Sequence, residues 1–209
     1  MSASHSKLIS RTFIFFALLT SLLGSAVLVT PAYAAGITVN SNADTTADDG
    51  ACTLQEALAN ANGDSQLYAT SGECAAGSGS DTISFDSGLS GATIYLASTL
   101  DITSDLTIDG SALTTKITIS GDSDIDGNSS LPDVRVFYVG SGVTAMLDSL
   151  IITKAFSQIS GGGVLNDGTL TVTNSIFTAN VVDNNLGGAI MNNGTLTITG
   201  STFSGNMAY

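Results

Sequence analysis

Short runs of alternating apolar and polar residues make up most of the chain after residue 81, and Gly, Asn, Asp and Ser separate the runs. Alternation with a period of two is typical of β-strands that bury one face. The pattern is strictest near the end, where residues 161–180 recur as residues 187–206, 26 residues later and without a gap. One repeat cannot bury its apolar face alone, so neighbouring repeats must stack. The pattern therefore predicts an all-β solenoid over residues 81–209.

The apolar positions keep their register from one repeat to the next. We expect Leu170 to lie over Leu196 in a shared dry core, at the strand spacing of about 4.8 Å. Ladders of identical side chains stabilise stacked strands. The positions expected to stack in three successive coils are Ala145, Leu147, Leu150 and Ile152; then Leu170, Val172, Ser175 and Phe177; then Leu196, Ile198, Ser201 and Phe203, with Asn180 over Asn206.

The N-terminus has the order of segments found in a secretory signal peptide. Two basic residues precede an apolar run over residues 13–29, and Pro31 and an Ala-Tyr-Ala triplet ending at Ala34 follow it. This order predicts a signal peptide over residues 1–34, cleaved after Ala34. An uncleaved membrane anchor is the alternative. No other apolar segment approaches spanning length, so we expect no membrane insertion after cleavage and a secreted protein.

A helix start signal follows in residues 35–80. Thr53 stands three residues before Glu56, and apolar residues at helical spacing continue to Gly63, where the helix should stop. Thr53 and Glu56 can satisfy each other's backbone amides as a capping box, which explains Glu56 without a catalytic role. We expect residues 35–80 to form a cap module with a short helix, because the open core of a terminal coil must be covered.

Cys52 and Cys74 are the two cysteines of the chain. An even number of cysteines in an exported protein favours a disulfide between them. A thiol nucleophile is the alternative, but the sole histidine, His5, lies in the predicted signal peptide and is unable to activate it. The formal net charge is −13, and charged residues are only 11% of the chain. Such a chain repels nucleic acid, yet it is too apolar to be an acidic disordered tail.

The sharpest local motif is acidic. Asp122, Asp124 and Asp126 alternate before Gly127, and Asp133 occupies the twelfth position of the same loop. This is the spacing of an EF-hand calcium loop, with Asp in place of the final Glu. The flanking segments look like strands, however, and the eighth position is polar. A Ca²⁺ site formed by these four aspartates and a solvated acidic turn therefore remain alternatives, and we expect no other cofactor.

Two resemblances to known families cover most of the chain. Residues 52–57, with the sequence Cys-Thr-Leu-Gln-Glu-Ala, resemble the Cys-Ser-Leu-Arg-Glu-Ala motif of the CSLREA domain of secreted bacterial proteins, with Thr53 for Ser and Gln55 for Arg. The repeats are similar to polymorphic outer membrane protein repeats, at residues 188–190 with 203–206 and more loosely at 162–164 with 177–180. These resemblances imply a right-handed, single-stranded parallel β-helix on a bacterial cell-envelope surface, without a defined catalytic mechanism.

Two classes of function remain open. Hydroxyl-rich strands such as residues 169–173 suit weak, repeated contacts with glycans or other surface proteins, although β-propensity alone also explains their threonines. Long β-helices also host polysaccharide lyases and glycosidases, and the aspartates of the acidic loop, with Arg135 and Lys154, are candidates for such chemistry. Most other aspartates stand singly in predicted turns. We therefore expect a structural or adhesive protein rather than an enzyme, in a chain truncated at its C-terminus after residue 209.

Overall fold

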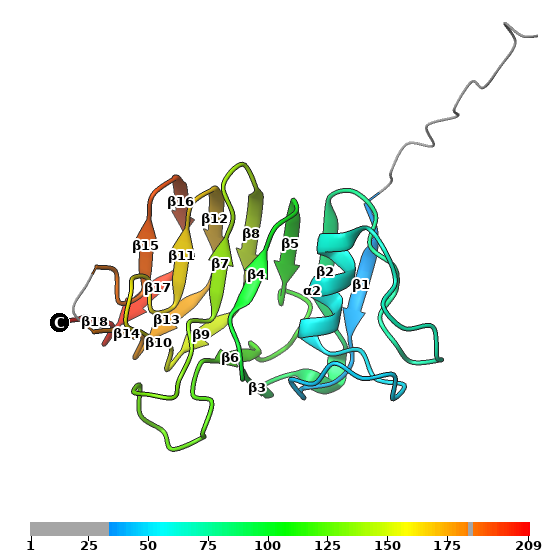
Figure 1. The fold of residues 1–209 in the computed structure, drawn as a ribbon, viewed down its shortest axis with the longest axis horizontal. Helices are drawn as coiled ribbons and strands as arrows, with labels where there is room; N and C mark the ends of the chain where they lie inside the picture. Colours follow the sequence, from blue (N-terminus) through cyan, green and yellow to red (C-terminus); the bar gives the residue numbers. More distant parts are fainter. Residues whose placement is uncertain (1–33, 184–185) are drawn as a thin grey trace, which may run out of the picture. The chain divides into compact units, whose positions relative to one another are not determined.

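The computed structural model describes residues 34–183 and 186–209, so the predicted signal peptide lies outside the described residues except for Ala34. The described part is a parallel β-solenoid of about five turns with one short helix near its N-terminal part (Figure 1). Every pairing between the described strands is parallel. The predicted fold class is confirmed. No helix in the described ranges has the length and hydropathy to cross a bilayer.

The longest sheet takes one strand from each turn. Its strands lie side by side along the stack, as the arrows β1, β2, β5, β8, β12 and β16 show from right to left in Figure 1. We call it the long sheet. In order, its strands are β1 (Gly36–Val39), β2 (Asp81–Phe85), β5 (Leu106–Asp109), β8 (Thr144–Asp148), β12 (Thr169–Thr173) and β16 (Thr195–Thr199).

Three shorter sheets close the other sides of the turns. The five-stranded sheet contains β3 (Thr93–Tyr95), β6 (Thr118–Ser120), β9 (Ile151–Thr153), β13 (Ile176–Thr178) and β17 (Thr202–Ser204). The four-stranded sheet contains β4 (Leu100–Ile102), β7 (Phe137–Val139), β11 (Val164–Asn166) and β15 (Ile190–Asn192). The three-stranded sheet contains β10 (Phe156–Ser157), β14 (Val181–Val182) and β18 (Met207–Ala208), and a 3-10 turn spans Ser87–Leu89.

The core fills the space that the sheets enclose. Strand β12 pairs with β16 so that Leu170 lies opposite Leu196, as the repeat predicts, and Leu170 is fully buried. The rings of Phe177 and Phe203 stack with centroids 4.9 Å apart. Burying one such large apolar side chain contributes about 1.5–3 kcal/mol. Since the alternate residues of each strand point outward, the stacking leaves Thr, Ser and Asn on the surface.

In the last three turns of the described chain, two corners use left-handed backbone. At the corner between the long and the five-stranded sheets, Ser149 and Asn174 have φ of 60° and 49°, and Gly200 takes the same place one turn later with φ 61°. At the next corner Ala179 has φ 53° and Gly205 has φ 62°. Left-handed backbone costs a residue with a Cβ about 1–2 kcal/mol. The corner residues that are not glycine are therefore strained.

The buried Asn180 follows the second corner and satisfies backbone groups of the turn before it. Its Oδ1 accepts from the amide of Ala155 at 3.1 Å, and its Nδ2 donates to the carbonyl of Ile152 at 3.0 Å. The same Nδ2 donates to Oδ1 of Asn206 at 2.9 Å, which forms the predicted ladder. Since buried backbone polar groups need partners, Asn180 holds two turns in register.

The N-terminal helix α2 (Leu54–Gly63) begins with the predicted capping box. The amide of Glu56 donates to Thr53 Oγ1 at 3.2 Å, and the amide of Thr53 donates to Glu56 Oε2 at 3.0 Å. The helix ends at Gly63 as expected, and Asp64 takes the left-handed cap position that follows it, with φ 46°. Cys52 and Cys74 form the predicted disulfide.

The segment before and including α2 covers the first turn. Helix α2 packs against β1, β2 and β4. Asn62 at its end donates to the carbonyl of Asp101 in β4 at 2.7 Å and accepts from the amide of Thr103 at 2.8 Å. Asp44 accepts from the amide of Ala97, after β3, at 2.7 Å. Side chains of this segment therefore satisfy backbone groups at the first edges of the four-stranded and five-stranded sheets.

Of the two strand-like segments that flank the acidic loop, the second, residues 134–136, lies just before a strand rather than within one. Strand β7 begins at Phe137, and Val134 is only half buried. Val134 instead bridges two neighbouring turns, because its amide donates to Gly121 and its carbonyl accepts from Phe156.

Candidate functional site

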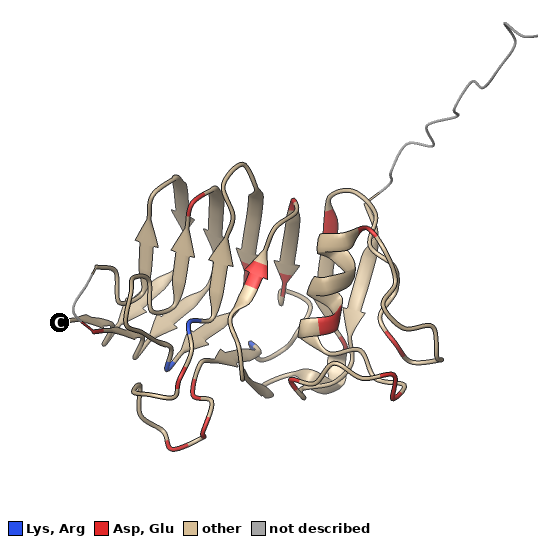
Figure 2. Cartoon of the chain, in the orientation of Figure 1, with Lys and Arg blue, Asp and Glu red and all other residues tan. Residues whose placement is uncertain are grey.

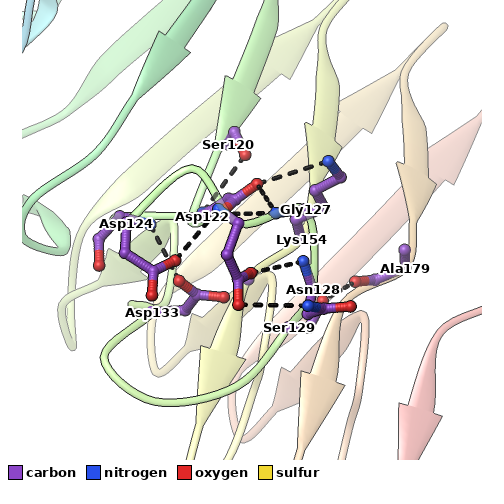
Figure 3. A network of polar contacts seen from close by, with 12 residues as sticks. Ser120, Asp122, Asp124, Gly127, Asn128, Ser129, Asp133, Lys154 and Ala179 are labelled. Atoms are coloured by element: carbon purple, nitrogen blue, oxygen red, sulfur yellow. Dashed lines mark hydrogen bonds and ion pairs between the residues drawn. The ribbon is translucent and has the colours of Figure 1, made fainter.

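The loop between β6 and β7 brings three of the four predicted calcium ligands together. The carboxylates of Asp122, Asp124 and Asp126 each offer an oxygen within 4.8 Å of the others. Asp122 is 1% exposed, whereas Asp124 and Asp126 are exposed. Figure 3 shows Asp122, Asp124 and Asp133 and the contacts that hold the loop. The position of this loop at the outside of the stack is visible in Figure 1, below β6.

Asp122 is the anchor of this loop. Its Oδ2 accepts from the backbone amide of Gly127 at 3.1 Å and forms an ion pair with Lys154 Nζ at 3.4 Å (Figure 3). Lys154 lies after β9, one turn further along, and its side chain is 36% exposed. A buried carboxylate needs such a partner. The lysine therefore supplies the positive charge that a cation at this carboxylate would otherwise supply.

Asp133 plays a different part from the three clustered aspartates. It is 6% exposed. Its Oδ1 accepts from the amide of Ser123 at 2.9 Å, and its Oδ2 accepts from the amide of Ser130 at 3.1 Å. Burial raises the pKa of the Asp133 carboxyl, and the negative charges of Asp122 and Asp124 add to that rise. Asp133 thus closes both ends of the loop, and its role as a fourth Ca²⁺ ligand stays a prediction.

The exposed members of the cluster are engaged locally. Asp126 accepts from the amide of Asn128 at 2.7 Å and from its Nδ2 at 3.2 Å. These two hydrogen bonds lower the pKa of Asp126. Asp124 accepts from the amide of Asp126 at 3.3 Å. Local turns of this kind form without a metal, so calcium binding by Asp122, Asp124 and Asp126 also stays a prediction.

Arg135 does not join the acidic loop. Its guanidinium donates to the carbonyls of Gly161 and Ser160 and to Ser157 Oγ, so it ties one turn to the segment before β11. Burial lowers the pKa of Arg135, although the charge of Asp101 opposes that shift. Of the two basic residues considered for polysaccharide chemistry, only Lys154 contacts the loop.

A polar pair that the sequence analysis did not identify lies on the four-stranded sheet. The hydroxyl of Tyr138 donates to Asp167 Oδ2 at 3.0 Å, and this hydrogen bond raises the pKa of Tyr138. Asn193 donates from Nδ2 to the other oxygen of Asp167 at 2.8 Å. Asp167 and Asn193 occupy the same place in the two repeats, which is the signal that could have indicated their contact. The hydrogen bonds among Tyr138, Asp167 and Asn193 join three successive turns.

The outward face of the long sheet is mostly uncharged. One column of outward positions passes through Thr82, Thr107, Met146, Thr171 and Thr197, which are neighbours in the register of the sheet. Figure 2 shows tan over most of the strands of this part of the chain, with acidic residues gathered in turns and loops. A shallow groove crosses this face; its lining residues include Asp81, Thr82, Asp105, Thr107, Met146 and Thr171.

One acidic pair interrupts this face. Asp109 in β5 lies directly opposite Asp148 in β8, so these two aspartates are not single turn residues as the sequence analysis expected. Asp109 accepts from the amide of Ser111 at 2.7 Å. Asp148 accepts from Ser149 Oγ at 2.9 Å and from Asn174 Nδ2 at 3.4 Å. Neighbouring strands place such residues about 5 Å apart.

Comparison with known protein families, with curated proteins and with solved structures found no match to this chain.

Proposed function

We propose that this chain is an exported structural or adhesive cell-surface protein that binds glycans or other surface proteins without turning them over. The observation that carries this proposal is the column of hydroxyl and thioether side chains on the long sheet. Thr107 and Thr171 flank Met146 in register and all three line the groove. Hydroxyl groups can hydrogen-bond a sugar while the apolar side chain of Met146 packs against its ring. Repetition of such weak contacts gives avidity.

The family resemblances are part of the same proposal. The resemblance of residues 52–57 to the CSLREA motif and of the repeats to polymorphic outer membrane protein repeats supports a right-handed β-helix on a bacterial envelope. The structure adds a physical reason for the motif, since Thr53 and Glu56 cap helix α2 and Cys52 forms the disulfide of the cap. Secretion through the predicted signal peptide completes this proposal.

A glycan array tests binding on the secreted protein, run beside assays for new reducing ends and for unsaturated sugar products, each with and without EDTA. We expect binding without turnover. The double variant Thr107→Val, Thr171→Val removes two groove hydroxyls with little change of shape and should weaken binding about tenfold, as the loss of two hydrogen bonds predicts. The matched control is Thr178→Val on the five-stranded sheet, outside the groove, which should bind as the unaltered chain does. Equal binding by all three proteins would remove the groove from the proposal.

The register of Asp109 and Asp148 favours a second candidate, a polysaccharide lyase or glycosidase. Retaining glycosidases use two carboxylates about 5 Å apart, and Asp109 and Asp148 are two acidic residues on adjacent strands whose backbones lie directly opposite each other, at the strand spacing of about 4.8 Å. Under this alternative, the variants Asp109→Asn and Asp148→Asn would each abolish sugar product formation. Under the first proposal no product forms with any of the three proteins.

A further inference from the structure

The last turn of the described chain leaves core positions open. Strands β15, β16, β17 and β18 are the final strands of the four sheets. Val172 and Phe177 are fully buried one turn earlier, whereas their partners Ile198 and Phe203 are 44% and 40% exposed and Met207 is 45% exposed. We call the surface made by these four strands the end face. It combines exposed apolar side chains with strand edges that have no further strand among the described residues.

The polar corners of the turns show what chemistry fits this end face. The amide of Leu150 donates to Ser175 Oγ at 3.1 Å, and the amide of Ser175 donates to Ser201 Oγ at 3.0 Å. The ladder therefore has a direction, because each hydroxyl accepts from the amide of the turn before it. Within residues 34–183 and 186–209, the amide of Ser201 has no such acceptor. A hydroxyl placed over Ser201, as Ser201 lies over Ser175, would continue the ladder.

The second corner repeats this logic with asparagine. The amide of Ala155 donates to Asn180 Oδ1, and the amide of Asn180 donates to Asn206 Oδ1, each at 3.1 Å. The amide of Asn206 is the next donor in the series, and the described part of the chain gives it no acceptor. Serine and asparagine acceptors, spaced as Ser201 and Asn206 are, would complete both ladders.

A second copy of this chain does not offer these acceptors. In a head-to-tail arrangement its first turn is covered, since α2 packs on β1 and β4 and Asn62 occupies the backbone of β4. In a tail-to-tail arrangement the corner amides of Ser201 and Asn206 in one copy would face the same donors in the other. Two donors that face each other leave both without an acceptor, which disfavours this arrangement.

We propose that the end face is a docking surface for a further parallel β-coil, a segment that places Ser over Ser201, Asn over Asn206 and apolar side chains over Ile198 and Phe203. The interface would continue the one that already joins β12 to β16 and β13 to β17. Recognition is strand addition, with backbone hydrogen bonds for affinity and the corner side chains for register. A shift of one residue would turn the apolar side chains of the added strands outward.

An extension of the full chain tests this proposal. A copy of residues 184–206 is placed directly after Tyr209, which sets the copies of Ser201 and Asn206 one turn beyond the originals. The first control inserts one Ser at the junction and shifts the register. The second control keeps the register but replaces the copied Ser201 and Asn206 by Ala. Amide hydrogen exchange at Ser201 and Asn206 reports the docking, and sedimentation reports the oligomeric state.

The in-register extension should slow exchange at both amides by about tenfold or more, as a newly formed, cooperative turn does. The shifted extension should leave exchange unchanged, and the alanine extension should protect these two amides several-fold less. Equal protection by the in-register and shifted extensions would overturn the proposal. So would a dimer of the unextended chain in which Ser201 and Asn206 are already protected, because the occupant would then be a second copy.

Discussion

Asn180→Ala should be among the most destabilising single changes in the solenoid. Asn180 is fully buried, and its side chain is the partner of the Ala155 amide and of the Ile152 carbonyl. Removing it leaves the buried Ala155 amide without a partner, at about 1–3 kcal/mol, and takes one hydrogen bond from the Ile152 carbonyl, at about 0.5–1.5 kcal/mol. The cavity adds to that cost. We expect the free energy of unfolding to fall by about 3–5 kcal/mol.

The matched control is Asn206→Ala. Asn206 makes equivalent contacts, to the Phe177 carbonyl at 2.9 Å and the Asn180 amide at 3.1 Å, but it is only half buried on the end face. Water can reach the groups that it leaves, so the cost should be about 1 kcal/mol. Urea unfolding followed by far-ultraviolet circular dichroism measures both variants, with the slope of the transition checking that they unfold in the same way. Equal losses for the two variants would refute the argument that burial of the ladder sets its value.

Three further changes test other parts of the structure. Ala179→Gly should raise the free energy of unfolding by about 1 kcal/mol because glycine adopts the left-handed φ of 53° at this corner without strain. Glycine already stands at the equivalent corner one turn later, where Gly205 has φ 62°. A loss of stability in urea would contradict this prediction. Lys154→Met should lower the free energy of unfolding by about 1–3 kcal/mol because Asp122 stays buried without its cation. If the acidic loop binds Ca²⁺, calcium should restore the stability of this variant and EDTA should abolish the recovery. A melting temperature that does not respond to calcium would count against the site. Burial raises the pKa of Asp44 above its ordinary 3.8, so the stabilising effect of its proton is complete below that value and is lost as pH rises through the folded pKa. The variant Asp44→Asn should therefore melt at a higher temperature than the unaltered chain at pH 7, and the difference should shrink toward pH 3. A difference that stays constant with pH would show that the charge of Asp44 is not the cause.

The regular turns could be predicted because the sequence repeats and the contacts repeat together. Leu170 and Leu196 pair in the predicted register because nothing interrupts the chain between equivalent corners. The capping box of Thr53 and Glu56 was also predictable, since both partners lie within one helical turn. Local chemistry and an unbroken period thus specify most of the fold.

The candidate site was less predictable because the period is broken there. The acidic loop lengthens one turn, so β5 pairs with β8 at an offset of 39 residues instead of 25 or 26. A pattern of fixed spacing therefore misses the facing positions of Asp109 and Asp148. The ion pair between Lys154 and Asp122 is hidden for the same reason, since it joins the inserted loop to the following turn.

A pair of engineered cysteines tests the stacked register most directly. Thr171 and Thr197 face outward on neighbouring strands β12 and β16, directly opposite each other. Parallel strands lie about 4.8 Å apart, within the Cα separation of about 4.4–6.8 Å that a disulfide spans. The variant Thr171→Cys, Thr197→Cys should therefore form a second disulfide beside Cys52–Cys74 under mild oxidation, as mass spectrometry of the digested protein would show. The variant Thr171→Cys, Thr199→Cys, offset by two residues, should form far less. Cross-linking of the offset pair, with none of the opposed pair, would contradict the solenoid on which the functional proposal rests.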